Sequence, residues 1–295
     1  MNETYQKHKM ISCSLEIDIT TPGALPEIPL EDLSAELKET LSRLEEGYSA
    51  LDREMQDVNA PVDMNTYIIR KEALHSSAIA GIHSTLDELL DESESPEAKK
   101  IAALEGAYHY GIKSLERLPL SSRLLKDMHS VLMHGEAGLS DFRRHQIYFG
   151  DESRGLSEAT FIPAAPEDLT DLMSEFETYL NGRGETPDLI RLALSFYQLE
   201  TIKPFAEGNG PMARALILLF LLDKSIIRLP LFEISHVLLK HEHELQRELS
   251  DARSATSFDQ WLSFFLGLLM EALESSTLSL KQLKFFFEDN PHGKG

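Results

Sequence analysis

The sequence predicts an all-α domain. Apolar residues recur at three- and four-residue spacing along most of the 295-residue chain, which is the period of helices that bury one face. Strand signals are few, and 42% hydrophobic residues with a mean hydropathy of -0.22 are typical of a soluble globular protein. This length fits one large domain, or a domain with an appendage.

The helices are predicted from this periodicity in chain order, after an N-terminal stretch of about 25 residues that we expect to be irregular. Ser121 is a suitable N-cap, and Pro187 is placed near a first helical turn. The expected helices cover residues 30–55, 64–82, 96–117, 121–133, 166–180, 188–202, 212–224, 234–253 and 258–287.

Residues 146–163 are the exception to the helical pattern. Two short runs rich in aromatic and β-branched residues flank a polar turn, which predicts a β-hairpin. An isolated hairpin is marginally stable and must pack on another element. Because a strand edge can capture an extended peptide, we expect this hairpin to be functional.

Charge and composition exclude several classes of protein. The net charge is -21 and the pI is about 4.9, with no segregated basic patch, so nucleic acid is not an expected partner. The longest apolar run, residues 215–222, is far too short for a membrane span. With no signal-peptide pattern and only one cysteine, Cys13, we expect a cytoplasmic protein without disulfides or membrane contact.

Residues 203–214 carry the strongest chemical signal. Gly208, Asn209 and Gly210 stand directly before an apolar stretch that predicts a buried helix, so their N–H groups and the helix dipole favour phosphate. Glu207 is suited to hold a divalent cation against that phosphate, and Arg214 is placed to reach a terminal phosphate. An ordinary glycine-capped loop is the alternative for such a short motif.

This segment resembles the motif His-Pro-Phe-x-(Asp/Glu)-Gly-Asn-Gly-Arg-x-x-Arg of the Fic (Fido) family, and the resemblance extends from about Leu25 onward. It implies a Fic helical fold and transfer of AMP from ATP to a hydroxyl group of a target protein. It also implies Glu207 as the Mg²⁺ ligand, Gly208, Asn209 and Gly210 as the anion hole, and Arg214 as the contact to the terminal phosphates of ATP or ADP.

Two further segments resemble the same family. Ser76 and Gly81 match the inhibitory pattern (Ser/Thr)-x-x-x-Glu-(Gly/Asn), whose Glu pairs with the second motif arginine, but Ala80 stands at the Glu position. The resemblance therefore divides the chain into an N-terminal helical region with a degenerate inhibitory segment, residues 1–115, and a Fic core with closing helices, residues 116–295. The predicted hairpin would be the flap that aligns an unknown target protein through residues 161–163, Phe161, Ile162 and Pro163. A homo-oligomer is left open.

Two departures from the motif decide the expected activity. Lys203 replaces the histidine that serves as general base, and Pro211 replaces the first arginine. The ordinary pKa of a lysine side chain is about 10.4, so a lysine is protonated near pH 7 and is a poor base. We expect nucleotide binding with impaired or absent transfer. The alternatives are an active nucleotidyltransferase that uses Lys203, and an interaction or regulatory pseudoenzyme without nucleotide.

Overall fold

The computed structural model describes residues 5–12, 15–56, 62–91, 94–134, 141–150 and 158–289. These residues are mostly helical, which confirms the predicted all-α class. The helices are α1 (Ala35–Gln56), α2 (Val62–Ile79), α3 (Leu86–Leu90), α4 (Pro96–Leu115), α5 (Ser122–Leu132), α6 (Leu169–Leu180), α7 (Asp188–Ile202), α8 (Asn209–Asp223), α9 (Ser235–Lys240), α10 (Glu242–Ser254) and α11 (Asp259–Asp289), with short 3-10 turns at Leu30–Asp32 and Pro166–Asp168.

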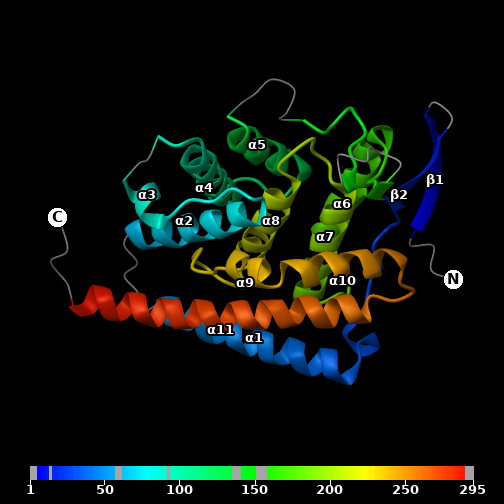
Figure 1. Cartoon of the computed structure of the whole chain (residues 1–295). Helices are drawn as coiled ribbons and strands as arrows, with labels where there is room; N and C mark the ends of the chain where they lie inside the picture. The colour runs from blue at the N-terminus through cyan, green and yellow to red at the C-terminus, as the bar shows by residue number, and fades with distance from the viewer. Residues whose placement is uncertain are drawn as a thin grey trace.

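Helices α7 and α8 form the centre of the molecule. Every residue of α7 from Leu189 to Ile202 is buried, as are nearly all residues of α8 from Met212 to Leu221. A helix that is apolar on all sides is stable only when neighbours surround it, and α2, α4 and α5 contact α8 while α6, α10 and α11 contact α7. Figure 1 shows α1 and α11 side by side beneath this centre.

The observed helices differ from the predicted ones at several points. The helix predicted over residues 234–253 is two helices that meet at His241, whose ring nitrogens lie 3.3 Å from Glu244 and 2.9 Å from Glu271. Helix α8 begins at Asn209, three residues early, because Gly208 bends the chain with a φ of 73°. Helix α3 was not predicted, although Thr85 and Glu88 form a capping box at its start.

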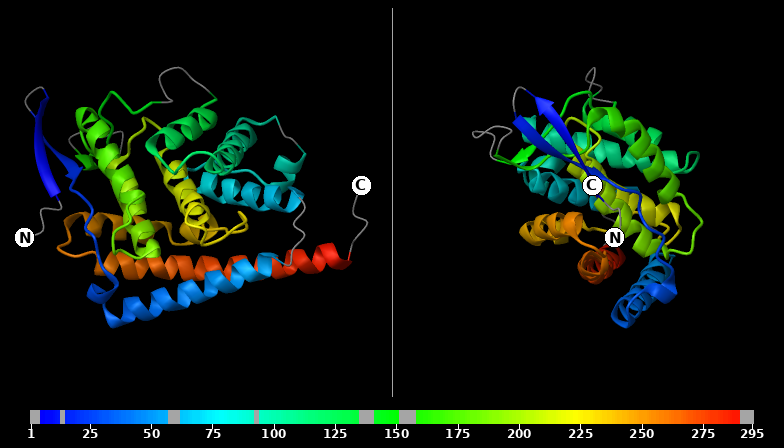
Figure 2. Two further views of the ribbon diagram at one scale, coloured as in Figure 1. Left: turned by 180° about the vertical axis from the view of Figure 1, so that it is seen from behind. Right: turned by 90° about the vertical axis from the view of Figure 1, so that its right-hand side faces the viewer.

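The expectation that residues 1–25 are irregular is wrong. Strands β1 (Tyr5–Ser12) and β2 (Leu15–Pro22) form an antiparallel hairpin that lies at one end of the molecule (Figure 2). The sequence of β2 alternates apolar and polar residues from Leu15 to Thr20, which is the period of a strand with one buried face. The end of β2 contacts α7, so this hairpin is packed on the helical centre.

The predicted hairpin is present and short. Strand β3 (Phe149–Gly150) pairs antiparallel with β4 (Ala159–Phe161), with Phe149 opposite Phe161. The predicted turn between them, residues 151–157, lies outside the described residues.

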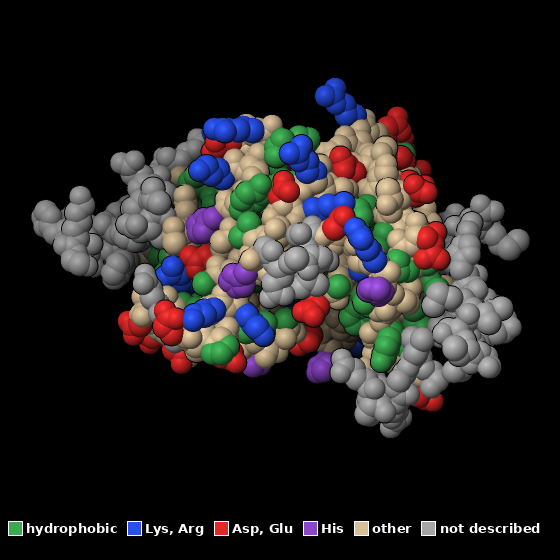
Figure 3. All heavy atoms as spheres, turned by 90° about the horizontal axis from the view of Figure 1, so that it is seen from above, with side chains coloured by type: hydrophobic (Ala, Val, Ile, Leu, Met, Phe, Trp, Pro, Cys, Tyr) green, Lys and Arg blue, Asp and Glu red, His purple; other side chains and the backbone are tan. Residues whose placement is uncertain are grey.

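Within the described ranges, no helix has both the length and the apolar character that a membrane span requires. Seen from above, Lys and Arg side chains are interspersed with Asp and Glu side chains over the surface (Figure 3).

A buried carboxylate ties α2 to α9. The Glu72 side chain is 1% exposed and accepts hydrogen bonds from the N–H groups of Ile234 (2.9 Å) and Ser235 (3.0 Å) and from the Ser235 hydroxyl. It therefore caps the first turn of α9. Burial raises the pKa of Glu72 above its ordinary value, although the bonds from Ser235 and Ile234 oppose the rise.

We expect Glu72→Ala to lower the free energy of unfolding by about 3 kcal/mol, because buried donors then lose their acceptor. In Glu72→Gln most of these bonds survive.

Since the pKa of Glu72 is higher in the folded chain than the unfolded value of about 4.3, its stabilising contribution is complete below about pH 4 and is lost as the pH rises through the folded pKa. Urea unfolding should show that native protein loses stability relative to Glu72→Gln as the pH rises from 4 to 7. A cost for Glu72→Ala no larger than that for the exposed Glu36→Ala would contradict the capping role.

Candidate functional site

The loop between α7 and α8 has its shape fixed from within. Helix α7 ends at Lys203 in a left-handed conformation with a φ of 48°. The Asn209 side chain then closes the loop, because its Oδ1 accepts from the N–H of Phe205 (2.8 Å) and its Nδ2 donates to the carbonyl of Phe205 (2.7 Å). The Phe205 ring is buried and stacks on His129 with ring centroids 3.9 Å apart. The sequence predicted Asn209 for the anion hole. These contacts use one of the two Nδ2 hydrogens, and the backbone N–H of Asn209 has no intrahelical acceptor.

Helix α8 presents its first backbone donors at this loop. The first intrahelical bond runs from the N–H of Met212 to the carbonyl of Gly208 (3.1 Å), so the N–H groups of Asn209 and Gly210 have no intrahelical acceptor. Pro211 stands in the same first turn, where proline interrupts no helical bond, and α8 continues through it as the sequence predicts. Two free donors at the positive end of a helix dipole are suited to an anion.

His129, which the sequence did not indicate for this loop, contacts the backbone of the loop at Glu207. The Nε2 atom of His129, a fully buried residue of α5, lies 2.9 Å from the backbone carbonyl of Glu207. A Cβ atom at Gly208 would lie 3.0 Å from Leu132 and 3.2 Å from His129, so the backbone approaches α5 closely and only glycine fits without strain. The Glu207 side chain remains exposed.

Arg214 joins this loop to α2. Its Nε donates to the Ser76 hydroxyl (2.8 Å) and its Nη2 to the Ser76 carbonyl (2.8 Å), while Nη1 is 3.0 Å from the place of a Cβ atom on Gly210. Burial lowers the pKa of Arg214 and the charge of Glu200 opposes this, but an arginine so placed stays a cation. Ser76 therefore orients Arg214 with two neutral acceptors, while the negative charge of Glu200 also acts on the guanidinium.

Lys203 is held by a carboxylate that the sequence analysis gave no role. Its ammonium donates to the side chain of Glu200, one turn earlier on α7, and lies 5.4 Å from the centroid of the Phe149 ring in the flap. Burial would raise the pKa of Glu200, but the charges of Lys203 and Arg214 outweigh it and keep that pKa below its ordinary value. Lys203 is therefore one half of an ion pair enclosed by α7 and the flap.

A cavity of about 390 Å³ opens beside the loop. Ala80 and Pro211 both line it, and these are the positions where the family pattern has glutamate and arginine. Two short side chains in place of two long ones leave the cavity unfilled. Its other lining residues are Ser77, Ile82, Lys100, Leu104, Leu132, Met133, His134, Glu207 and Gly208. Gly81, with a φ of 74°, follows the end of α2 and stands between the lining residues Ala80 and Ile82.

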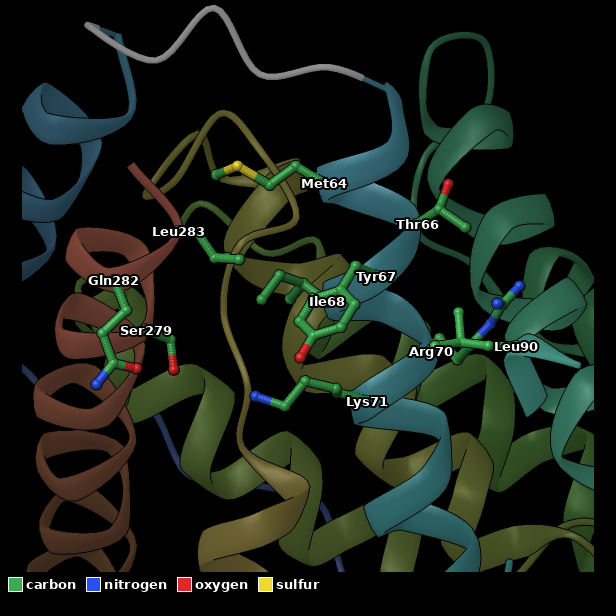
Figure 4. A pocket seen from close by; sticks show the side chains of 10 residues that line it. All are labelled: Met64, Thr66, Tyr67, Ile68, Arg70, Lys71, Leu90, Ser279, Gln282 and Leu283. Atoms are coloured by element: carbon green, nitrogen blue, oxygen red, sulfur yellow. The ribbon is translucent and has the colours of Figure 1, made fainter. Parts of the chain in front are cut away.

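A second cavity, of about 690 Å³, lies between α2 and the C-terminal half of α11. Figure 4 shows Tyr67 and Lys71 of α2 directed toward Ser279 and Gln282 of α11. Lys71 is paired with the buried Glu233 at 2.9 Å, so its charge is compensated. None of the residues from Lys203 to Arg214 lines this cavity, and we assign the candidate site by chemistry rather than by volume.

The flap is fixed to the same loop. Buried Arg143 donates from Nε to the carbonyl of Lys203 (2.9 Å) and from its guanidinium to the carbonyl of Ala164. Burial lowers the pKa of Arg143 to about 10, so it is charged near neutral pH. The predicted flap residues Phe161, Ile162 and Pro163 therefore have a defined position relative to Lys203.

The donor set for a metal is small. Among the residues that the structure describes, no group of three or more His, Cys, Asp or Glu side chains could hold a metal ion. Mg²⁺ in nucleotide sites is commonly bound by one or two carboxylates together with substrate phosphates and water. A single exposed carboxylate at Glu207, beside the free donors of α8, fits that mode.

Comparisons with known proteins relate this chain to the Fic/DOC family. A model of the Fic/DOC family matches residues 119–221. The protein adenylyltransferase Fic of Drosophila virilis is 29% identical in an alignment of 198 residues that covers 62% of this chain and 36% of that protein. The protein of the same name from Drosophila mojavensis is 30% identical in an alignment of 192 residues that covers 57% of this chain and 36% of that protein. The chain thus matches only about a third of the length of these curated relatives.

Solved structures show the same fold. A Fic family protein from Desulfovibrio desulfuricans G20 superposes with a TM-score of 0.70 at 19% identity, over 85% of this chain and 77% of that one. Fic-1 from C. elegans superposes with a TM-score of 0.61 at 18% identity, over 84% of this chain and 72% of that one. The helical architecture described above is the Fic fold.

Proposed function

We propose that the domain matched by the Fic/DOC family model binds a nucleotide at the Gly208–Arg214 segment but transfers AMP poorly or not at all. The observation that carries the proposal is that the residues suited to bind phosphate are present, while the residue at the position of the base is not suited to accept a proton. The anion-binding end of α8 and the oriented Arg214 are intact, whereas Lys203 at the base position is engaged in an ion pair with Glu200.

Phosphate binding is supported by three features in one place. The N–H groups of Asn209 and Gly210 are free of intrahelical partners, Arg214 lies against Gly210, and Glu207 is exposed at the cavity. Together they supply dipoles, a cation and a carboxylate, which is the donor set that a nucleotide with Mg²⁺ requires. When bound, Mg²⁺ at Glu207 would neutralise phosphate charge.

Weak transfer follows from what AMP transfer requires. A target hydroxyl oxygen attacks the α-phosphorus of ATP, pyrophosphate leaves, and a base near the hydroxyl accepts its proton. An ammonium that donates to Glu200 has no lone pair for that proton. Pro211 also supplies neither a guanidinium nor an N–H to the phosphates, which removes stabilisation of the transition state. The protein target is proposed to align along the flap residues Phe161, Ile162 and Pro163.

Calorimetry with Mg-ATP and Mg-ADP tests the binding half of this proposal. We expect millimolar or tighter binding by native protein, at least about ten-fold weaker binding by Glu207→Ala, and no change in Glu36→Ala, which removes an exposed carboxylate on α1. Equal binding by both variants would exclude the proposed cation site, and no binding by native protein would leave an interaction protein without nucleotide.

The same proteins, incubated with ATP labelled at the α-phosphate, test the transfer half. Little or no label is expected on native protein or on proteins of a cell extract. Strong labelling that Lys203→Ala abolishes would show instead that Lys203 serves as a base.

A further inference from the structure

The outer edge of the flap is already paired with a strand of the same chain. The N–H of Thr20, near the end of β2, donates to the carbonyl of Ile162 at 2.9 Å, and Thr20 forms a parallel bridge with Pro163. Phe161, the residue before Ile162, pairs with Phe149 of β3 on the opposite edge. One hydrogen bond and one isolated bridge therefore join the end of β2 to the edge of the flap.

A small apolar cluster accompanies this pairing. Ile19 is 2% exposed and packs with Ile162 and Ala165, each 6% exposed, and with Ala159. This cluster is separate from the main core, in which the buried residues of the helices are continuous. Because few residues hold it, a small satellite cluster opens more readily than a domain core.

The flap keeps its position by contacts that do not involve β2. The guanidinium of Arg253 on α10 lies 3.6 Å from the centroid of the Phe161 ring, and Phe161 also stacks on Phe149 at 5.8 Å. The Nε2 of Gln146 donates to the carbonyl of Pro163 (2.8 Å). The edge at Ile162 and Pro163 is thus a preformed template, and removal of β2 would uncover it without dismantling it.

The strand is tethered close to this edge. The Nε2 of Gln198, a buried residue of α7, donates to the carbonyl of Gly23 at 3.0 Å. The chain is therefore anchored directly after Pro22, and residues 19–22 face the flap at the high effective concentration of an intramolecular ligand.

We propose that residues 19–22 occupy, as a displaceable internal ligand, a docking edge for an extended segment of the partner protein. This proposal rests on the proposed function, since it assigns regulation to the flap on which a target would align. The partner that fits has an apolar β-branched residue in the place of Ile19, followed by a residue other than proline, because Ile162 needs an N–H donor.

The test uses a fluorescent peptide with the sequence of residues 16–24 and measures its binding to full-length chains by anisotropy. Ile19→Asp places a charge in the satellite cluster and frees the edge, so this variant should bind the peptide at least about ten-fold more tightly than native protein. Leu278→Asp is the control, because Leu278 is an apolar residue 58% exposed on α11, and it should bind like native protein. A peptide with aspartate in place of Ile19 should bind none of the chains.

A second variant, Thr20→Pro, removes the donor to Ile162 and should also bind the peptide more tightly than native protein, even if Ile19→Asp fails to fold by circular dichroism. Equal binding by native protein and the folded variants would overturn the proposal, as would an absence of binding to all of them. Nucleotide binding is measured separately on the same chains. If none of them binds nucleotide but the variants bind the peptide more tightly than native protein, only the proposed function is rejected.

Discussion

The double variant Lys203→His/Pro211→Arg is expected to incorporate AMP from ATP at least about 100-fold faster than the native chain. A neutral imidazole at position 203 can accept the proton that an ammonium cannot. Histidine also tolerates the left-handed backbone found there, with a φ of 48°. The arginine at position 211 would have room, because Pro211 lines a cavity of about 390 Å³.

Each single replacement should restore less than the pair, since base and phosphate contact act on one transition state. Glu207→Ala in the double variant should abolish the gained labelling and serves as the control for a site-specific reaction. Label measured by autoradiography and located by mass spectrometry checks this result. A folded double variant that binds nucleotide but gains no label would show that the loss of activity lies outside positions 203 and 211.

The second large effect is expected from Ala80→Glu, which should weaken nucleotide binding by about ten-fold or more. Ala80 lines the same cavity as Glu207, Gly208 and Pro211, so a carboxylate there would stand beside the bound phosphates and repel them. It would also compete for the charge of Arg214, which Ser76 only orients. The matched control is Ala80→Gln, which has the same size without the charge.

Calorimetry with Mg-ADP compares the two variants, and high salt should narrow the difference between them because part of it is electrostatic. If Ala80→Gln weakened nucleotide binding as much as Ala80→Glu, the effect would come from the larger side chain occupying the cavity rather than from its charge. If neither variant changed nucleotide affinity, the cavity beside Ala80 would not be the nucleotide site.

Much of the fold could be predicted because its helices follow one period. Helix α8 was predicted from residues 212–224 and the flap from two short apolar runs around a turn, and both are present. The break at His241 did not appear in the period, and the contact of its ring with Glu271, thirty residues away on α11, is visible only in the fold. The strand β2 was missed although its alternation was visible and its partner β1 directly precedes it. Only its contact with Ile162, more than a hundred residues later, depends on the fold.

The candidate site was predicted in its parts rather than in its contacts. The motif indicated Gly208, Gly210 and Arg214 as parts of one site; in the structure Gly210 lies against Arg214, and Gly208 lies against His129 and Leu132. The ion pair of Lys203 with Glu200 has the three-residue spacing of a helical pair and was within reach of the sequence. The bond from Arg214 to Ser76 joins residues 138 positions apart, so only the fold shows it. Arg214 is held by Ser76 although Ala80 stands where the family pattern has glutamate.

The most direct test of nucleotide binding at this loop is a titration of isotope-labelled native protein with Mg-ADP, followed through backbone amide chemical shifts. The amides of Asn209 and Gly210 should shift most, because they are the free donors at the start of α8, and Glu207→Ala should weaken the response. Shifts confined to α2 and α11 around Tyr67 and Gln282, or no shifts at millimolar nucleotide, would contradict a nucleotide site between Gly208 and Arg214.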